Sequence, residues 1–296
     1  MDGILNIYKE AGWTSNDVVQ KLRGILRTKK VGHGGTLDPA VTGVLPVAVG
    51  KATRLLEYMD SAGKIYRGEI TLGFSTETED ATGALVERTP VSPGLTEAKV
   101  DQAMGQFLGK IQQIPPMYSA VKVNGRKLYE YARKGQTVER PVREVEIKEL
   151  VRTSPLKFDD QDCVSFDFRV ACSKGTYVRT LAVDLARDLG YAGHMACLQR
   201  TMANGLIIDN SKKLVEVENA RDEGKLDELF LPMAWAVSGL ERFNLSEAEF
   251  AAVQVGKRIR RNLPVSNEPI AVFYGEKLVG ICQTLENELK PKKILI

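Results

Sequence analysis

The sequence predicts an α+β protein with a mixed, largely antiparallel sheet, flanking helices and a small β-rich module at its C-terminal end. Two segments, Ile65–Phe74 and Cys163–Cys172, alternate apolar and polar residues with the period of a half-buried strand. Segments with helical spacing lie between such strands, but no regular strand–helix–strand rhythm repeats. This interspersed order favours an α+β arrangement over a doubly wound parallel sheet.

The first helix is expected at Thr14–Arg27. Thr14 or Ser15 can cap its N-terminus, Asp17 falls in the first turn, and apolar residues recur behind them at helical spacing. The opposite side is cationic, so we expect one face in the core and the other toward solvent or RNA.

A glycine-rich segment follows. Three glycines in four residues surround His33, and Pro39 biases Asp38 toward an extended conformation, so Gly32–Pro39 is predicted to be a loop. The next two segments are predicted to be an apolar strand (44–49) and the beginning of a helix (52–59).

Two further features complete the predicted architecture. After the second alternating strand, the chain turns at Gly175 and enters a helix that Gly190 is suited to end. Residues 238–296 contain a short helical segment and brief strands divided by glycines, which indicates a separable module. We therefore expect two domains, residues 1–237 and 238–296.

Composition limits the possible functions. Of the 296 residues, 43% are hydrophobic and 27% are charged, which is ordinary for a globular protein. No apolar run approaches ~20 residues and the N-terminus lacks a signal-peptide pattern, so we expect no membrane association. Four cysteines without a CxxC pair indicate free thiols in a reducing compartment, hence a cytoplasmic protein. Two of them, Cys172 and Cys197, are expected to be buried, and with only two histidines we expect no metal site.

The net charge is only +3, but the basic residues gather in four clusters. This segregation can produce a basic face that attracts phosphates, whereas solvated helix faces and loops would explain any one cluster alone. The clusters comprise Lys21, Arg23, Arg27, Lys29 and Lys30; seven basic residues from Lys122 to Arg143; Lys257, Arg258, Arg260 and Arg261; and Lys290, Lys292 and Lys293.

The segment GHGGTLDPAVTG, residues 32–43, is the most unusual part of the chain. It presents the Asp38 carboxylate in a glycine-rich setting but matches neither a phosphate-binding P-loop nor a dinucleotide-binding fingerprint. From the residues alone, a tight loop with Asp38 as a turn residue explains it as well as a catalytic carboxylate does.

Five motifs in order nevertheless resemble the TruB family of tRNA pseudouridine synthases, across most of residues 1–210. They are KEAGWTS (9–15), VGHGGTLDPAVTGVLPVAVGKATR (31–54), KIYRGEITLGFSTETEDATG (64–83), CSKGTYVRTLAVDLARDLG (172–190) and CLQRTMANGL (197–206). The sequence departs from the usual family residues at Glu10, Gln199, Asn204 and Leu206. Asn204 replaces a common glycine, and asparagine tolerates left-handed backbone angles better than most residues.

The resemblance implies a pseudouridine synthase fold followed by a PUA-like RNA-binding domain. It also implies that the protein isomerises uridine 55 in the TΨC stem-loop of tRNA, without a cofactor, and we expect a monomer. Catalytic roles carry over to Asp38, Arg179, which would pair with Asp38, and Tyr66, which would stack on the target base. Substrate-binding roles carry over to His33, Lys9, Asp80, Tyr177 and Leu198.

Plainer alternatives stand beside each assignment. Without the resemblance, Arg179 is more readily explained as a helix-surface arginine, Tyr66 as a core tyrosine and His33 as a loop residue. Lys9 is equally compatible with a solvated lysine and with support for the Asp38 loop. At the level of function, the alternatives are a non-catalytic tRNA-binding or RNA-folding module, and a hydrolase built around Asp38 that releases free uracil.

Overall fold

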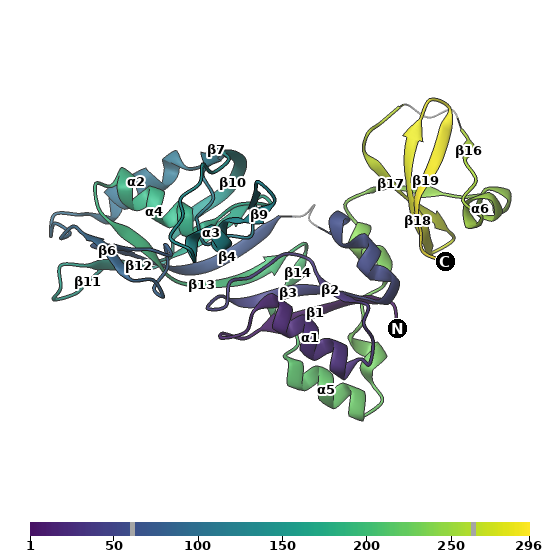
Figure 1. The fold of residues 1–296 in the computed structure, drawn as a ribbon, viewed down its shortest axis with the longest axis horizontal. Helices are drawn as coiled ribbons and strands as arrows, with labels where there is room; N and C mark the ends of the chain where they lie inside the picture. Colours follow the sequence, from purple (N-terminus) through teal and green to yellow (C-terminus); the bar gives the residue numbers. More distant parts are fainter. Residues whose placement is uncertain (60–62, 262–264) are drawn as a thin grey trace. The chain divides into compact units, whose positions relative to one another are not determined.

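The computed structural model describes residues 1–59, 63–261 and 265–296. The chain forms two compact units, and it leaves the first unit twice and returns to it twice (Figure 1). Unit 1 comprises Met1–Pro39, Val44–Ala62 and Asp209–Ile296, and unit 2 comprises Ala40–Gly43 and Gly63–Ile208. The domain boundary between residues 237 and 238 stays a prediction.

The part of unit 1 that precedes residue 238 packs helices against short strands. In Figure 1, α1 and α5 lie beside each other next to β1 and β3. Its elements are β1 (Gly3–Lys9), α1 (Ser15–Ile25), β2 (Val31–His33), β3 (Thr42–Val49), the 3-10 helix η1 (Gly50–Tyr58), α5 (Leu214–Asp222), η3 (Leu226–Leu229) and η4 (Met233–Val237).

The predicted first helix is confirmed, and Thr14 caps it. The Thr14 hydroxyl accepts a hydrogen bond from the Asp17 backbone N–H at 3.0 Å, and the Asp17 carboxylate accepts one from the Thr14 backbone N–H at 2.9 Å. Val18 and Leu22 on its inner face enter a core shared with β3 and α5. The helix ends at Ile25 rather than Arg27, because Arg27 has a left-handed φ of 50°.

The glycine-rich segment differs from the prediction at its start. Gly32 and His33 belong to β2, which pairs antiparallel with β3, so the loop begins only after His33. A Cβ at Gly32 would lie 2.8 Å from the Leu56 side chain, so glycine permits close packing of this strand against η1. The predicted helix near residues 52–59 is the 3-10 helix η1.

Unit 2 is built on an antiparallel sheet in the order β13-β4-β12-β10-β7. The first residues of β3, Thr42 and Gly43, pair parallel with Gln199 and Arg200 of β13. The strands of the unit are β4 (Lys64–Leu72), β5 (Phe74–Thr76), β6 (Leu85–Arg88), β7 (Gly109–Gln113), β8 (Lys122–Val123), β9 (Arg126–Lys127), β10 (Arg143–Arg152), β11 (Lys157–Phe158), β12 (Val164–Cys172), β13 (Gly193–Ala203) and β14 (Leu206–Ile207).

Helices cover one face of this sheet. Helices α2 (Glu97–Gln106) and α4 (Val178–Asp188) pack against each other, α2 on β10 and α4 on β13, while α3 spans Leu128–Ala132 (Figure 1). The predicted end of α4 is confirmed, because Gly190 adopts a left-handed φ of 83° directly after the Leu189 cap. The 3-10 helix η2 (Ile208–Asn210) follows β14.

The two alternating segments form neighbouring strands, β4 and β12. Every second residue of β12 is buried, as predicted, and β12 pairs with β4 along its whole length. The other segment is interrupted: β4 ends at Leu72, and Phe74 begins the separate strand β5. Gly73 lies between them with φ +121°, and a Cβ there would meet the Cys163 sulfur at 2.7 Å. The close approach requires glycine and breaks the strand.

Strand β13 corrects one prediction and confirms another. Cys172 of β12 is buried, but Cys197 is exposed, because the β13 register shifts between Met195 and Cys197 and turns the thiol outward. Asn204 has the left-handed φ of 56° that the sequence allowed. With Gly205 it forms a two-residue turn between β13 and β14, where positive φ at both positions is favoured.

The C-terminal sheet has five strands in the order β15-β17-β18-β19-β16. This sheet confirms that the C-terminal segment is β-rich, as predicted. Its core includes Val272, Val279 and Leu289. Its elements are β15 (Glu241–Asn244), α6 (Glu247–Gln254), β16 (Ile259–Arg260), β17 (Pro269–Tyr274), β18 (Lys277–Leu285) and β19 (Glu288–Ile294). The α+β prediction is therefore confirmed. Across the described residues, none of the helices has the length and hydrophobicity needed to cross a lipid bilayer.

Candidate active site

The predicted site residues are divided between the two units. Unit 1 carries Lys9, His33 and Asp38, and unit 2 carries the other five residues: Tyr66, Asp80, Tyr177, Arg179 and Leu198. Within each unit, the local structure indicates what the side chains can do.

Lys9 is the last residue of β1, and its side chain is 0% exposed. A buried ammonium group is stable only when its N–H donors are satisfied. The Nζ atom donates to three carbonyl oxygens, those of Glu10 at 3.1 Å, Trp13 at 2.6 Å and Pro39 at 3.0 Å. The solvated-lysine alternative is therefore wrong, and Lys9 joins the end of β1 to the loop that carries Asp38.

The residues on both sides of Asp38 are fixed by hydrogen bonds. Ser15 at the start of α1 is buried, and its Oγ accepts from the Leu37 backbone N–H at 2.9 Å and donates to the Leu37 carbonyl at 3.1 Å. The Gly12 N–H also donates to the Pro39 carbonyl at 3.0 Å. Asp38 is partly buried between these two anchored neighbours. Its carboxylate therefore stands on a loop whose backbone is held in place before substrate binds.

His33 ends β2 and pairs with Val47 of β3. It is partly buried, and two glycines follow it. The strand fixes the position of its backbone, and the glycines after it allow the chain to turn sharply into the Asp38 loop.

Arg179 lies in the first turn of α4 and is 6% exposed, so the alternative of a helix-surface arginine is wrong. Its Nη1 donates to the Thr78 carbonyl and its Nη2 to the Tyr118 carbonyl, both at 2.9 Å. Two carbonyls from separate segments thus fix the plane of the guanidinium. A planar fork held in this way suits bidentate binding of a carboxylate.

Tyr66 lies on β4 between Val170 of β12 and Arg200 of β13. It is 7% exposed, which agrees with a core tyrosine as well as with a stacking platform. Leu198 pairs with Gly68 on the same face of the sheet, two positions along. At Gly68, a Cβ would lie 3.0 Å from the Leu198 side chain, so the glycine leaves room for Leu198 beside Tyr66.

In the loop after β5, the pKa values of two adjacent carboxylates are shifted in opposite directions. Burial raises the pKa of Glu79, although a hydrogen bond from Thr180 and the charge of Arg179 act against it. Burial also acts on Asp80, but hydrogen bonds from Thr78 and Thr82 outweigh it and lower the pKa of Asp80. Those bonds reach one carboxylate oxygen, from the two hydroxyls at 2.6 Å each and from the Thr82 backbone N–H at 2.9 Å.

Tyr177 is the N-terminal cap residue of α4, two residues before Arg179. The buried side chain of Gln113 binds its backbone on both sides, accepting from the Tyr177 N–H at 3.0 Å and donating to the Tyr177 carbonyl at 3.2 Å. This amide clamp connects the end of β7 to the start of α4, and so helps to set the position of Arg179.

Sequence reasoning missed the residues that support the predicted ones. Glu79 and Gln113 are examples, and Tyr118 contributes only its backbone carbonyl to Arg179. In the sequence, the direct adjacency of two acids, Glu79 and Asp80, is a signal that could have identified Glu79. Within the described part of the chain, no group of three or more His, Cys, Asp or Glu side chains is placed to hold a metal ion.

Comparison with known proteins identifies the family. A sequence model described as "TruB family pseudouridylate synthase (N terminal domain)" matches residues 23–178, more than half of the chain. A protein named tRNA pseudouridine synthase B from Lactococcus lactis subsp. cremoris is 55% identical, with 100% of this chain and 99% of that protein covered. Its namesake from Streptococcus pyogenes serotype M2 is 53% identical, with both chains covered completely.

Solved structures agree on the fold. A chain from "Structure of H/ACA RNP bound to a substrate RNA containing 2'-deoxyuridine" matches with a TM-score of 0.75 at 23% identity, covering 99% of this chain and 85% of that chain. A chain from "Crystal Structure of a Cbf5-Nop10-Gar1 Complex" matches with a TM-score of 0.73 at 25% identity and the same coverage. The predicted pseudouridine synthase fold with a PUA-like C-terminal sheet is confirmed, and the chain belongs to the TruB family of pseudouridylate synthases.

Proposed function

We propose that this protein isomerises uridine 55 in the TΨC stem-loop of tRNA to pseudouridine, with Asp38 as the single catalytic carboxylate. The observation that carries the proposal is the full-length match, above 50% identity, to proteins named tRNA pseudouridine synthase B. The anchored Asp38 loop and the oriented Arg179 guanidinium support it, because both are chemically suited to the reaction.

The reaction requires one ionised carboxylate near C1′ of the ribose. The N1–C1′ bond breaks, the uracil turns, a C5–C1′ bond forms, and the proton leaves C5 while N1 gains one. Product and substrate are isomers, so the protein needs no oxidant, reductant or nucleotide. Asp38 would either attack C1′ or remove the C2′ proton.

Arg179 would keep Asp38 ionised and fix its rotamer, because an opposite charge and a forked hydrogen bond both favour the carboxylate. Tyr66 would stack on the extruded base, a contact that contributes ~1–3 kcal/mol. Leu198 would complete the apolar wall beside it, and His33 would occupy the gap left in the RNA. Lys9 would act indirectly, by holding the Pro39 carbonyl.

Asp80 and Tyr177 would line the cleft that receives the nucleotide. Water must be kept from the detached base, since hydrolysis would release free uracil.

The C-terminal sheet would bind tRNA backbone. Of its basic cluster, Arg258 and Arg261 form ion pairs with Glu288 and Glu249, so Lys257 and Arg260 are better placed to meet phosphates. Since the proposed substrate is tRNA, we also propose that the protein acts in the cytoplasm, and we expect it to be a monomer.

The direct test is to map pseudouridine in tRNA from cells that lack this protein, and in unmodified tRNA treated with the purified protein. We expect position 55 to be uridine in the first case and pseudouridine in the second. A transcript with cytidine at position 55 serves as the control and should yield no product. Release of free uracil would indicate a hydrolase, and tRNA binding without any pseudouridine would indicate the non-catalytic RNA-binding module.

A further inference from the structure

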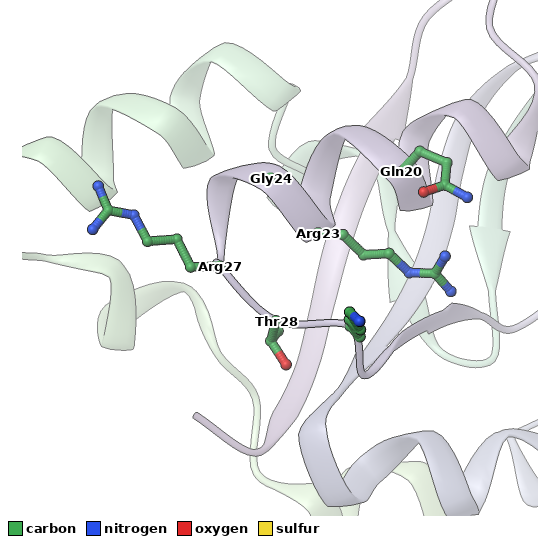
Figure 2. Close-up of a pocket in the computed structure, with 6 residues that line it drawn as sticks. Gln20, Arg23, Gly24, Arg27 and Thr28 are labelled. Atoms are coloured by element: carbon green, nitrogen blue, oxygen red, sulfur yellow. The ribbon is translucent and has the colours of Figure 1, made fainter.

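An open depression of about 690 Å³ lies at the C-terminal end of α1. Its lining carries three cationic side chains, an amide and a hydroxyl, and no acidic residue. In Figure 2, Gln20 and Arg23 extend to the same side of the helix, Arg27 reaches outward from the other side, and Thr28 lies between them. The lining residues are Gln20, Arg23, Gly24, Arg27, Thr28 and Lys29.

No acidic side chain of the residues that the structure describes pairs with the cations of this depression. Among the described residues, Arg23, Arg27 and Lys29 form no ion pair, whereas their neighbour Lys21 pairs with Glu218 at 3.6 Å. Arg23 is held in place by a hydrogen bond from Nη2 to the Val31 carbonyl at 3.2 Å. Its Nε is buried and has no hydrogen-bond partner in the described part of the chain. A guanidinium that is held at the edge of the depression and forms no ion pair with the described residues is suited to an anionic ligand.

Arg27 gives an independent indication. The end of α1 is a Schellman motif, with the Thr28 N–H bonded to the Arg23 carbonyl at 3.2 Å and the Arg27 N–H to the Gly24 carbonyl at 3.4 Å. Arg27 occupies the left-handed position of this motif with φ 50°, where glycine is normally preferred. A long cationic side chain at this position is unfavourable for the backbone, which points to a use for its charge.

We propose that this depression, which we call the α1 cation site, binds a phosphodiester of the tRNA backbone away from the target uridine. The inference rests on the proposed action on tRNA. Ser15, which anchors the Asp38 loop, lies at the opposite end of α1, about 16 Å away. A phosphate at the site would therefore position the RNA without touching the reacting base. The open, polar shape suits a strand lying on the surface better than an enclosed small molecule.

The test compares matched variants of the full-length protein in an Asp38→Asn background, so that tRNA is bound but not converted. Arg27→Gly and Lys29→Gln remove cations of the site, separately and together. Lys225→Gln is the control, because it removes the same charge from an exposed lysine paired with Glu223. The dissociation constant for unmodified tRNA is measured by filter binding over a salt series, and the melting temperature is recorded for each variant.

We expect each site variant to weaken tRNA binding by about tenfold, the lower end for a hydrogen bond to a charged group. The double variant should lower the salt dependence, the slope of log K against log salt, by about 0.8, since one phosphate contact contributes ~0.7–0.9. Arg27→Gly should melt at the same or a higher temperature, because glycine fits the left-handed position. Lys225→Gln should match the parent in affinity and slope.

Unchanged affinity and slope in the double variant would overturn the inference. A second outcome would also overturn it. If the double variant binds tRNA as tightly as the parent, and inorganic phosphate at constant ionic strength raises the melting temperature of the parent only, the depression is a site for free phosphate. With Asp38 restored, the double variant should show a raised KM at unchanged kcat. If the wild-type protein forms no pseudouridine, the proposed function fails. If the wild type forms pseudouridine but the double variant binds tRNA as the parent does, only the α1 cation site is refuted.

Discussion

Replacing Lys9 by methionine would remove the ammonium group that joins β1 to the Asp38 loop and keep a side chain of similar length. Three carbonyls lose the hydrogen bond from Lys9. The Pro39 carbonyl keeps its bond from the Gly12 N–H, so the loss falls on the other two, the carbonyls of Glu10 and Trp13. Each of these bonds joins a charged donor to a carbonyl and contributes about 1.5–3 kcal/mol, so the gross loss for the two is about 3–6 kcal/mol. Because methionine avoids the burial of a charge, we expect a net destabilisation of about 2–3 kcal/mol.

The measurement is urea denaturation of the wild type and of Lys9→Met at neutral pH, comparing midpoints at equal slope. Lys225→Met is the matched control, because Lys225 is exposed, and its change should stay within ~0.5 kcal/mol. The same Lys9 variant should lower kcat more than it weakens tRNA binding, since the Lys9 ammonium group holds the loop that carries Asp38.

A Lys9→Met protein that unfolds at the wild-type midpoint would refute the reasoning about the Lys9 hydrogen bonds. A protein that is destabilised as expected but retains full kcat would show that Lys9 stabilises the fold without positioning Asp38.

Two further predictions concern the neighbours of the site. Ser15→Ala should destabilise the protein by about 1–2 kcal/mol in the same denaturation assay, because it removes both hydrogen bonds to Leu37; an unchanged midpoint would contradict this. For Glu79, the raised pKa means that stability is fully present below its ordinary value of 4.5 and falls as pH rises through the raised value. Glu79→Gln should therefore lose less stability than the wild type between pH 4 and pH 7.5, whereas parallel melting temperatures over that range would be evidence against it.

Local patterns predicted the elements that local physics determines. Thr14 and Asp17 identify the start of α1 because a capping box requires only residues three apart. The strict alternation of β12 identifies a half-buried strand because its two faces meet different environments. Asn204 was expected to accept left-handed angles, and the turn with Gly205 uses that tolerance.

Features that depend on distant segments were not predictable in this way. The outward turn of Cys197 follows from a register shift against β4, and the break at Gly73 follows from contact with Cys163. Burial of Lys9 and Arg179 depends on carbonyls of other segments, such as Pro39 and Tyr118, which leave no mark in the sequence. The site residues were found through motifs of a family, and their supports through the structure.

The central claim is that one carboxylate, that of Asp38, performs the isomerisation. Its most direct test is the single-turnover release of tritium from C5-labelled uridine in tRNA, for wild type and Asp38→Asn, beside a binding assay for the same tRNA. Since asparagine keeps the size but not the charge, we expect a rate loss of at least about 10⁴-fold with nearly unchanged tRNA affinity. Turnover of Asp38→Asn at the wild-type rate would contradict the account.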